Sequence, residues 1–232
     1  MKRPNPFVVL STAVRLYSRP LRHRVRGHLR NNLGVRIGPI TVAGHCVVLR
    51  SPQLSDWSRW HELRIRDQEF IEPFWVSSPH SWAERHTERA WVEEYLHARR
   101  EARAGRALPL VIEVDGALAG QFNLERIDAW AGSAEGGVWI DSTLTGEGVA
   151  LAAGYLLAEY AFVVLGLHRL TAPVCVGNAS AARSAEQGGM HREGTMVGYL
   201  DVGGRRKDHH LWAITAEMWA AQKERISDHA AR

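Results

Sequence analysis

The amino-acid sequence predicts an α+β domain in which helices cover a mostly antiparallel β-sheet. The 232 residues are 45% apolar and 23% charged, a composition that provides enough apolar surface for a buried core. Segments with helical periodicity are interspersed with short β-rich runs. Two of these runs are joined by Asp115 and Gly116, a pair typical of tight hairpin turns. The length fits one domain with an extension, or two small domains.

Residues 1–37 are interpreted as a basic extension outside this domain. Residues 1–55 hold ten Lys and Arg and no Asp or Glu, whereas residues 56–232 carry a formal charge of −6. Such a segregated positive charge favours contact with an anionic partner, such as RNA, an acidic protein or a lipid surface. An extension that is solvated or packs on the domain is the alternative.

One apolar helical stripe is predicted inside the extension, and Pro20 should kink or end its helix. A secretory signal is the competing interpretation, because Lys2 and Arg3 precede an apolar run. Ser11 interrupts that run, Arg15 follows it, and no small-residue cleavage site is present, so export is not expected. The residues of the stripe recur at steps of three and four: Phe7, Leu10, Val14, Tyr17 and Leu21.

The first elements of the domain follow a predicted linker at residues 31–40, which are rich in Gly and Asn. Residues 45–52 are a strand candidate. Residues 54–67 form an amphipathic helix with Ser55 as its N-cap, and a longer helix runs from 81 to 105, where a glycine closes it.

The rest of the chain continues this mixture of strands and helices. Residues 108–127 contain the hairpin that turns at Asp115 and Gly116. Further elements are a strand at 135–141, a helix to about 165, a strand at 168–176, a short helix at 179–189 and a last strand at 207–215.

Several classes of protein are disfavoured by composition. Cys46 and Cys175 are far apart in sequence, which argues against a disulfide framework and suits a reducing, cytoplasmic compartment. The histidines show no i, i+4 pair, so no metal site is expected. No apolar run reaches the roughly 18 residues that a transmembrane helix needs.

A glycine pair marks the junction between the strand at 135–141 and the next helix. The first N–H groups of a helix have no partner within it, and without a Cβ a bulky anion can approach them. The phosphate-loop signature is excluded because no Lys follows Gly148, and Leu151 stands where a dinucleotide fingerprint needs a third glycine. A pyrophosphate site is therefore predicted here, with a plain tight turn as the alternative. Its amides are those of Thr145, Gly146, Gly148, Val149 and Ala150.

Three motifs together resemble the GNAT superfamily of acyl-CoA-dependent N-acetyltransferases. They are the segment "GLHRLTAPV", the stretch from Asn178 to Gly194 that ends in "REG", and "GGRRKDHHLWAI". More narrowly, the chain resembles the branch of the ribosomal-protein alanine N-acetyltransferases, and residues 62–79 and 82–91 are similar to its actinobacterial members. The resemblance covers residues 38–219, so residues 220–232 are expected to form a C-terminal tail.

The resemblance implies a GNAT fold, whose mixed sheet is splayed around acetyl-CoA with helices on both faces. Backbone near Trp139 and Ile140 would pair with the pantetheine arm, the glycine junction would hold the pyrophosphate, and Arg183 would lie near the nucleotide phosphate. Thr143 stands where the family usually has Gln or Arg before the first glycine. An amine would attack the thioester carbonyl, and a peptide or protein N-terminus is the favoured acceptor.

Four residues are candidates for the chemistry. Asn178 would brace the amine or CoA, although an Asn can simply cap a helix. Ser180 would donate to the thiolate, with a helix-start hydroxyl as the alternative. Glu72 and Glu135 are the acids nearest the expected acceptor mouth and would take a proton through water, unless they are merely solvated.

The chain also departs from the family. Ala181 and Ala185 stand where many members have a serine and a tyrosine that serve the CoA sulfur. The alternative to an enzyme is therefore a catalytically weakened GNAT-fold protein. It would bind or scaffold, and it would use residues 1–36 to dock on a protein, a ribosome or an anionic surface.

Overall fold

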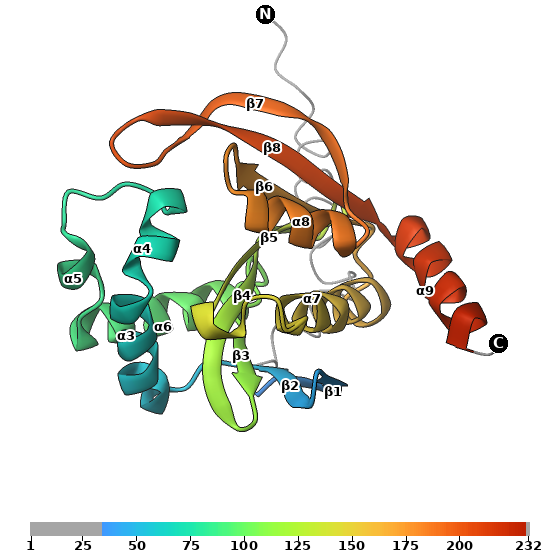
Figure 1. Ribbon diagram of the computed structural model, residues 1–232, viewed down its shortest axis with the longest axis horizontal. Helices are drawn as coiled ribbons and strands as arrows, with labels where there is room; N and C mark the ends of the chain where they lie inside the picture. The colour runs from blue at the N-terminus through green and yellow to red at the C-terminus, as the bar shows by residue number, and fades with distance from the viewer. Residues whose placement is uncertain (1–33, 231–232) are drawn as a thin grey trace, which may run out of the picture.

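A computed structural model describes residues 34–230 of the chain, and the side chains of residues 34–223 (Figure 1). Most of the predicted basic extension, including its apolar stripe, lies outside these residues. The described part is an α+β structure in which one eight-stranded sheet carries helices on both faces. The predicted fold class is confirmed.

The strands lie in the order β1-β2-β3-β4-β5-β6-β8-β7 across the sheet. Among the described residues, neighbouring strands are antiparallel except for β5 and β6, which run parallel. The turn between β3 and β4 is formed by Asp115 and Gly116, both at positive φ, as the sequence predicts. The bounds are β1 Arg36–Val42, β2 His45–Arg50, β3 Val111–Val114, β4 Ala117–Asp128, β5 Ser133–Ile140, β6 Arg169–Cys175, β7 His191–Asp201 and β8 Arg206–Thr215.

Strands β5 and β6 separate after a short paired stretch. Residues 133–135 of β5 lie opposite residues 169–171 of β6, and the described pairing between them ends with Glu135 and Thr171. From there β6, β8 and β7 turn away from the other five strands (Figure 1). The result is a wedge that leaves one edge of residues 136–140 open.

Helices cover the two faces of the sheet over separate cores. Residues of β3 alternate between these cores, since Val111 packs with Trp60, Trp82 and Trp91, whereas Ile112 packs under α7. The tryptophan side carries α3 Trp57–Arg66, α4 Gln68–Ile71, α5 Trp82–Arg85 and α6 Glu88–Arg103. The opposite side carries α7 Val149–Glu159, which continues as the π-helical turn η5 Tyr160–Val164, and α8 Ala179–Gln187, while α9 Ala216–Ala230 ends the described chain.

The structure corrects three sequence predictions. Residues 31–40 are not wholly a linker, because β1 begins at Arg36 and pairs with β2. The helix predicted at 81–105 is two helices, because Thr87 caps a new one through the amide of Ala90. Ser55 is not the N-cap of α3, since that position belongs to Asp56, whose buried carboxylate pairs with Arg50. Strand β7 and helix α9 were not predicted.

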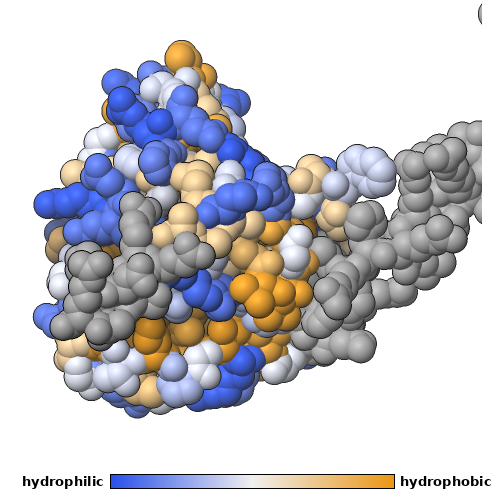
Figure 2. Space-filling model, turned by 90° about the vertical axis from the view of Figure 1, so that its right-hand side faces the viewer, coloured by the Kyte–Doolittle hydropathy of each residue, from blue (hydrophilic) through white to orange (hydrophobic). Residues whose placement is uncertain are grey.

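The side of the molecule formed by β1, α7 and α9 exposes apolar surface (Figure 2). In the turn η5, Val163 and Val164 are 64% and 36% exposed. This surface is remote from the wedge, which opens at the other end of α7 (Figure 1).

Candidate active site

The turn from β5 into α7 leaves backbone N–H groups unpaired. Gly146 and Gly148 have φ of 90° and 77°, a left-handed conformation that glycine adopts without strain. Gly148 is the N-cap of α7, so the amides of residues 149–151 have no carbonyl one turn earlier to bind. A Cβ on Gly146 would meet nothing within 4 Å, whereas one on Gly148 would lie 2.9 Å from Cγ2 of Val42. Gly146 therefore borders open space, and Gly148 allows α7 to pack against β1.

Two buried carboxylates fix this turn: Asp67, which accepts hydrogen bonds from Ser142, and Asp141. Asp141 accepts the amide and the hydroxyl of Thr143 at 2.9 and 2.6 Å, and it also pairs with Arg66. Burial alone would raise the pKa of Asp141, but the hydrogen bonds from Thr143 and Arg66 outweigh it and hold the pKa below its usual value. The Thr145 amide donates to the Ser142 carbonyl at 3.2 Å. Thr143 and Thr145 thus use these groups in hydrogen bonds within the turn and stabilise its shape.

The open edge of β5 presents the backbone of alternate residues. The amide of Asp141 donates to the Ala119 carbonyl on β4 at 2.7 Å. Because backbone groups point alternately to the two sides of a strand, those of Trp139 also face β4. The backbone N–H and C=O groups of Val138 and Ile140 face the wedge. The Trp139 side chain is buried, and its indole N–H donates to Gln121 at 2.8 Å.

Glu135 lies at the closed end of the wedge, where β5 and β6 part. Its Oε2 accepts a hydrogen bond from Nη1 of Arg126 at 2.8 Å, and the hydroxyl of Tyr199 lies 3.5 Å from the same oxygen. Its side chain is 23% exposed. The carboxylate therefore combines a fixed position with access to solvent.

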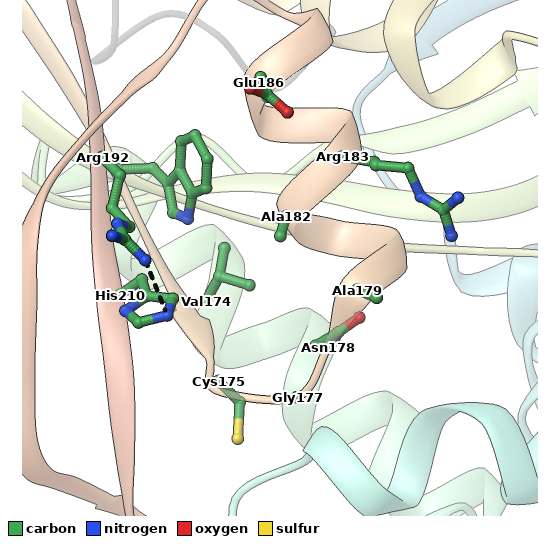
Figure 3. Close-up of a pocket in the computed structure, with 11 residues that line it drawn as sticks. Val174, Cys175, Gly177, Asn178, Ala179, Ala182, Arg183, Glu186, Arg192 and His210 are labelled. Atoms are coloured by element: carbon green, nitrogen blue, oxygen red, sulfur yellow. Dashed lines mark hydrogen bonds between the residues drawn. The ribbon is translucent and has the colours of Figure 1, made fainter.

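Helix α8 forms the other wall, beside a groove of about 570 Å³. Asn178 is its N-cap and accepts the amide of Ala181 at 3.1 Å, and Ser180 is exposed on its first turn. In Figure 3, Arg183 points to one side of α8, while Arg192 and His210 lie on the other side. The two sides of α8 therefore face different spaces.

A strap closes the wedge on the tryptophan side. The segment after η3 (Glu72–Phe74) forms a bridge between Val76 and Val202, and the Ser77 amide donates to the Asp201 carbonyl at 2.9 Å. Nζ of Lys207 also donates to the carbonyl of Pro73 at 3.3 Å. Apolar side chains are exposed on these elements and on the neighbouring strands: Phe70, Phe74, Val76, Val138 and Val197.

The structure brings most of the predicted site residues to the wedge. The glycine turn lies at its open end, Ile140 along its edge, Glu135 at its closed end, and Asn178 and Arg183 on α8. Glu72 lies apart, in η3 before the strap, where its Oε2 accepts a hydrogen bond from Gln68 at 2.6 Å. Sequence reasoning missed Arg126 and Tyr199 beside Glu135.

No group of three or more His, Cys, Asp or Glu side chains that could hold a metal ion occurs among residues 34–223. Within the described part of the chain, no helix is long and apolar enough to cross a membrane.

Comparison with known proteins places the chain among acetyltransferases. Residues 47–191 match the family model described as the acetyltransferase (GNAT) domain. The probable N-acetyltransferase YjcK of Bacillus subtilis is 27% identical over 172 residues, which are 74% of this chain and 94% of that protein.

Two solved structures extend the comparison. Mycobacterium smegmatis RimJ in complex with CoA-disulfide is 33% identical and matches with a TM-score of 0.76, covering 82% of this chain and 95% of that one. Spermidine N-acetyltransferase from Vibrio cholerae, in complex with CoA and spermine, is 23% identical with a TM-score of 0.63, covering 75% and 98%. The latter likeness concerns the fold alone.

Proposed function

The chain belongs to the GNAT family of acyl-CoA-dependent N-acetyltransferases, and we propose that it transfers the acetyl group of acetyl-CoA to the N-terminal amine of a peptide or protein. The observation that carries this proposal is the wedge between β5 and β6, with the open α7 N-terminus at one end and Glu135 at the other. A long ligand with an anionic head and a reactive tip matches that arrangement.

In this proposal, acetyl-CoA binds through backbone groups. The amides of the pantetheine arm would continue the sheet by pairing with Val138 and Ile140 on the open edge of β5. The pyrophosphate would lie at the α7 N-terminus, where Gly146 and the first helical amides donate to it and the helix dipole favours negative charge. The acetyl group would then point toward the closed end of the wedge.

The reaction requires that an ammonium ion lose a proton before its nitrogen can attack. Glu135 would take that proton at its carboxylate, directly or through one water. The amine nitrogen then forms a bond with the thioester carbonyl carbon, and the carbon–sulfur bond breaks. The second proton leaves the nitrogen as the amide forms and neutralises the CoA thiolate, while Glu135 returns its proton to solvent.

A peptide acceptor is favoured by the chemistry of the mouth. The charge of Glu135 is already paired with Arg126, and Glu72, in the nearby η3, is bonded to Gln68. A polyamine with several positive charges would be better matched by free carboxylates, whereas a peptide end can use the exposed apolar side chains on the strap. The relative at 33% identity, Mycobacterium smegmatis RimJ, was solved with CoA-disulfide, which supports CoA as the ligand of the wedge.

Thiol release tests the proposal. Purified protein is mixed with acetyl-CoA and either a short peptide that begins with alanine, the same peptide with a blocked N-terminus, or spermidine. Release with the free peptide only, and an acetyl group on its α-amine by mass spectrometry, is the expected result. Release with spermidine only would contradict the acceptor class.

The second candidate function is a binding protein that retains the fold. The observation that favours it is the face of α8, where Ala181 and Ala185 offer no polar group. Such a protein would show a thermal shift with acetyl-CoA and no thiol release with any amine.

A further inference from the structure

Strand β4 contains a bulge directly opposite the start of β5. Its register with β5 is regular up to Glu125 opposite Glu135, but the next pair is Asp128 opposite Ser133. Between these two pairs the chain advances by three residues on β4 and by two on β5, so β4 contains one extra residue. A bulge of this kind redirects a side chain that a regular strand would send to the other face.

The redirected residue is Arg126. Leu124 and Ile127 are both buried in the core beneath α7, although they are three residues apart. The extra residue between them lets Glu125 and Arg126 both point out of that core. The backbone of Arg126 is strained, because its φ of 50° lies in the left-handed region that an arginine rarely adopts.

The side chain of Arg126 joins the two halves of the splayed sheet. Its Nη1 donates to Oε2 of Glu135 at 2.8 Å and lies 2.7 Å from the hydroxyl of Tyr199 on β7. Tyr199 is held in turn by an edge-on contact with the buried ring of His209, at 5.5 Å between centroids. Strands β4, β5 and β7 therefore meet at one carboxylate oxygen.

The contacts leave the second oxygen of Glu135 unengaged. Both Arg126 and Tyr199 address Oε2, and among the described residues no hydrogen bond reaches Oε1. A carboxylate that is anchored by one oxygen keeps its other oxygen in a defined direction, at the point where the wedge begins.

We propose that Arg126 and Tyr199 are positioning residues for acetyl transfer, which anchor Oε2 of Glu135 so that Oε1 receives the proton of the acceptor amine. The inference rests on the proposed function and adds to it the source of the carboxylate's orientation. The strained backbone at Arg126 is the structural cost of bringing a cation to this carboxylate. A misplaced general base loses rate while the affinity for acetyl-CoA is unchanged, because Arg126 is not part of the open edge or the glycine turn.

Replacing Arg126 by Asn distinguishes an effect on the position of the Glu135 carboxylate from an effect on the stability of the fold. Asn tolerates left-handed backbone, so Arg126→Asn should melt no lower than the wild type although it removes the cation. We expect kcat to fall by about 10- to 100-fold with KM for acetyl-CoA unchanged. Arg126→Lys, which restores a positive charge, should recover part of kcat, and Tyr199→Phe should lower kcat less than Arg126→Asn does.

Ala43→Gly is the matched control. Ala43 has φ of 47° in the turn between β1 and β2, far from Glu135, so its replacement relieves similar strain without touching the carboxylate. It should raise the melting temperature and leave kcat unchanged. Full activity of Arg126→Asn beside an active wild type would overturn this inference and leave the proposed function standing. A wild type that releases no thiol with any amine would overturn both.

Discussion

The carboxylate of Asp67, at the end of α3, accepts both the amide and the hydroxyl of Ser142, at 2.9 and 2.7 Å. The two residues are 75 positions apart in the chain. Asp67 is 1% exposed and also pairs with Arg66. The helices of the tryptophan side are thereby fastened to the turn that leads to the proposed pyrophosphate site.

We expect Asp67→Asn to lower the free energy of unfolding by about 2 kcal/mol, because a buried charge-assisted set of hydrogen bonds is lost. Burial favours the neutral acid, but the hydrogen bonds from Arg66 and Ser142 outweigh it, so the pKa of Asp67 lies below its usual value. The stabilisation is therefore present above the unfolded pKa of about 3.9 and is lost as the pH falls below it. Denaturant melts across pH should show the two proteins converging in acid.

The matched control for this variant is Asp128→Asn. Asp128 also accepts two backbone amides, from Trp130 and Ala131, but it is exposed. It should cost less stability and leave acetyl-CoA affinity unchanged, whereas Asp67→Asn should weaken that affinity. Equal effects of the two substitutions on affinity would contradict a role for Asp67 in the turn.

Gly146→Ala should weaken acetyl-CoA binding at least about tenfold, since a Cβ would enter the space proposed for the pyrophosphate. Gly116→Ala is the control, because Gly116 has a φ of 86° and equally empty surroundings, but lies in the β3–β4 turn. Both variants carry similar backbone strain. Calorimetry that finds the same affinity for both would refute the placement of the anion.

The stability of the wild type should fall as the pH drops from about 6.5 to 4, and His86→Phe should flatten that fall. His86 is 3% exposed between Trp60 and Trp82, and burial lowers its pKa to about 4, although its hydrogen bond to the Trp82 carbonyl opposes the shift. In the unfolded chain His86 has a pKa of about 6.5, so between pH 6.5 and 4 the unfolded state binds a proton that the folded state does not. The free energy of unfolding therefore falls over this range. His80→Gln, at an exposed position nearby, should leave the pH profile of the melts unchanged.

Removal of residues 1–33 should leave acetyl transfer to a short peptide intact and weaken association with ribosomes. These residues carry eight Lys and Arg and no acid, so the association of the full chain should also fall steeply with salt. The opposite outcome is a truncated protein that melts well below the full chain, beside a full chain that binds neither ribosomes nor anionic vesicles. That result would favour an extension packed on the domain.

The sequence was sufficient for the elements with strong local signals. The hairpin at Asp115 and Gly116 and the glycine turn before α7 both depend on positive φ, which short motifs report well. Strand β1 was missed because Gly38 and Pro39 interrupt it, so composition indicated a linker where Ile37 and Ile40 pair with β2.

Only part of the proposed active site, the group of Glu135, Arg126 and Tyr199, could be predicted from the sequence. Glu135 was a candidate because it lies on the strand that precedes the glycines, but its partners come from β4 and β7, and Tyr199 lies 64 residues away. One signal was present in the sequence: Leu124 and Ile127 break the period of two, which indicates a bulge. The contact between Arg126 and Tyr199 depends on how far the sheet splays, which no local pattern encodes.

The bridge between Val76 and Val202 turns the mouth of the wedge into a ring of chain. The terminus of an acceptor polypeptide can pass through such a closed ring. An internal loop or a helix on a folded surface can enter only if the bridge breaks. With the bridge intact, the protein would therefore admit the terminal amine of a chain and exclude internal lysines. This selection would not depend on the side chains of the acceptor.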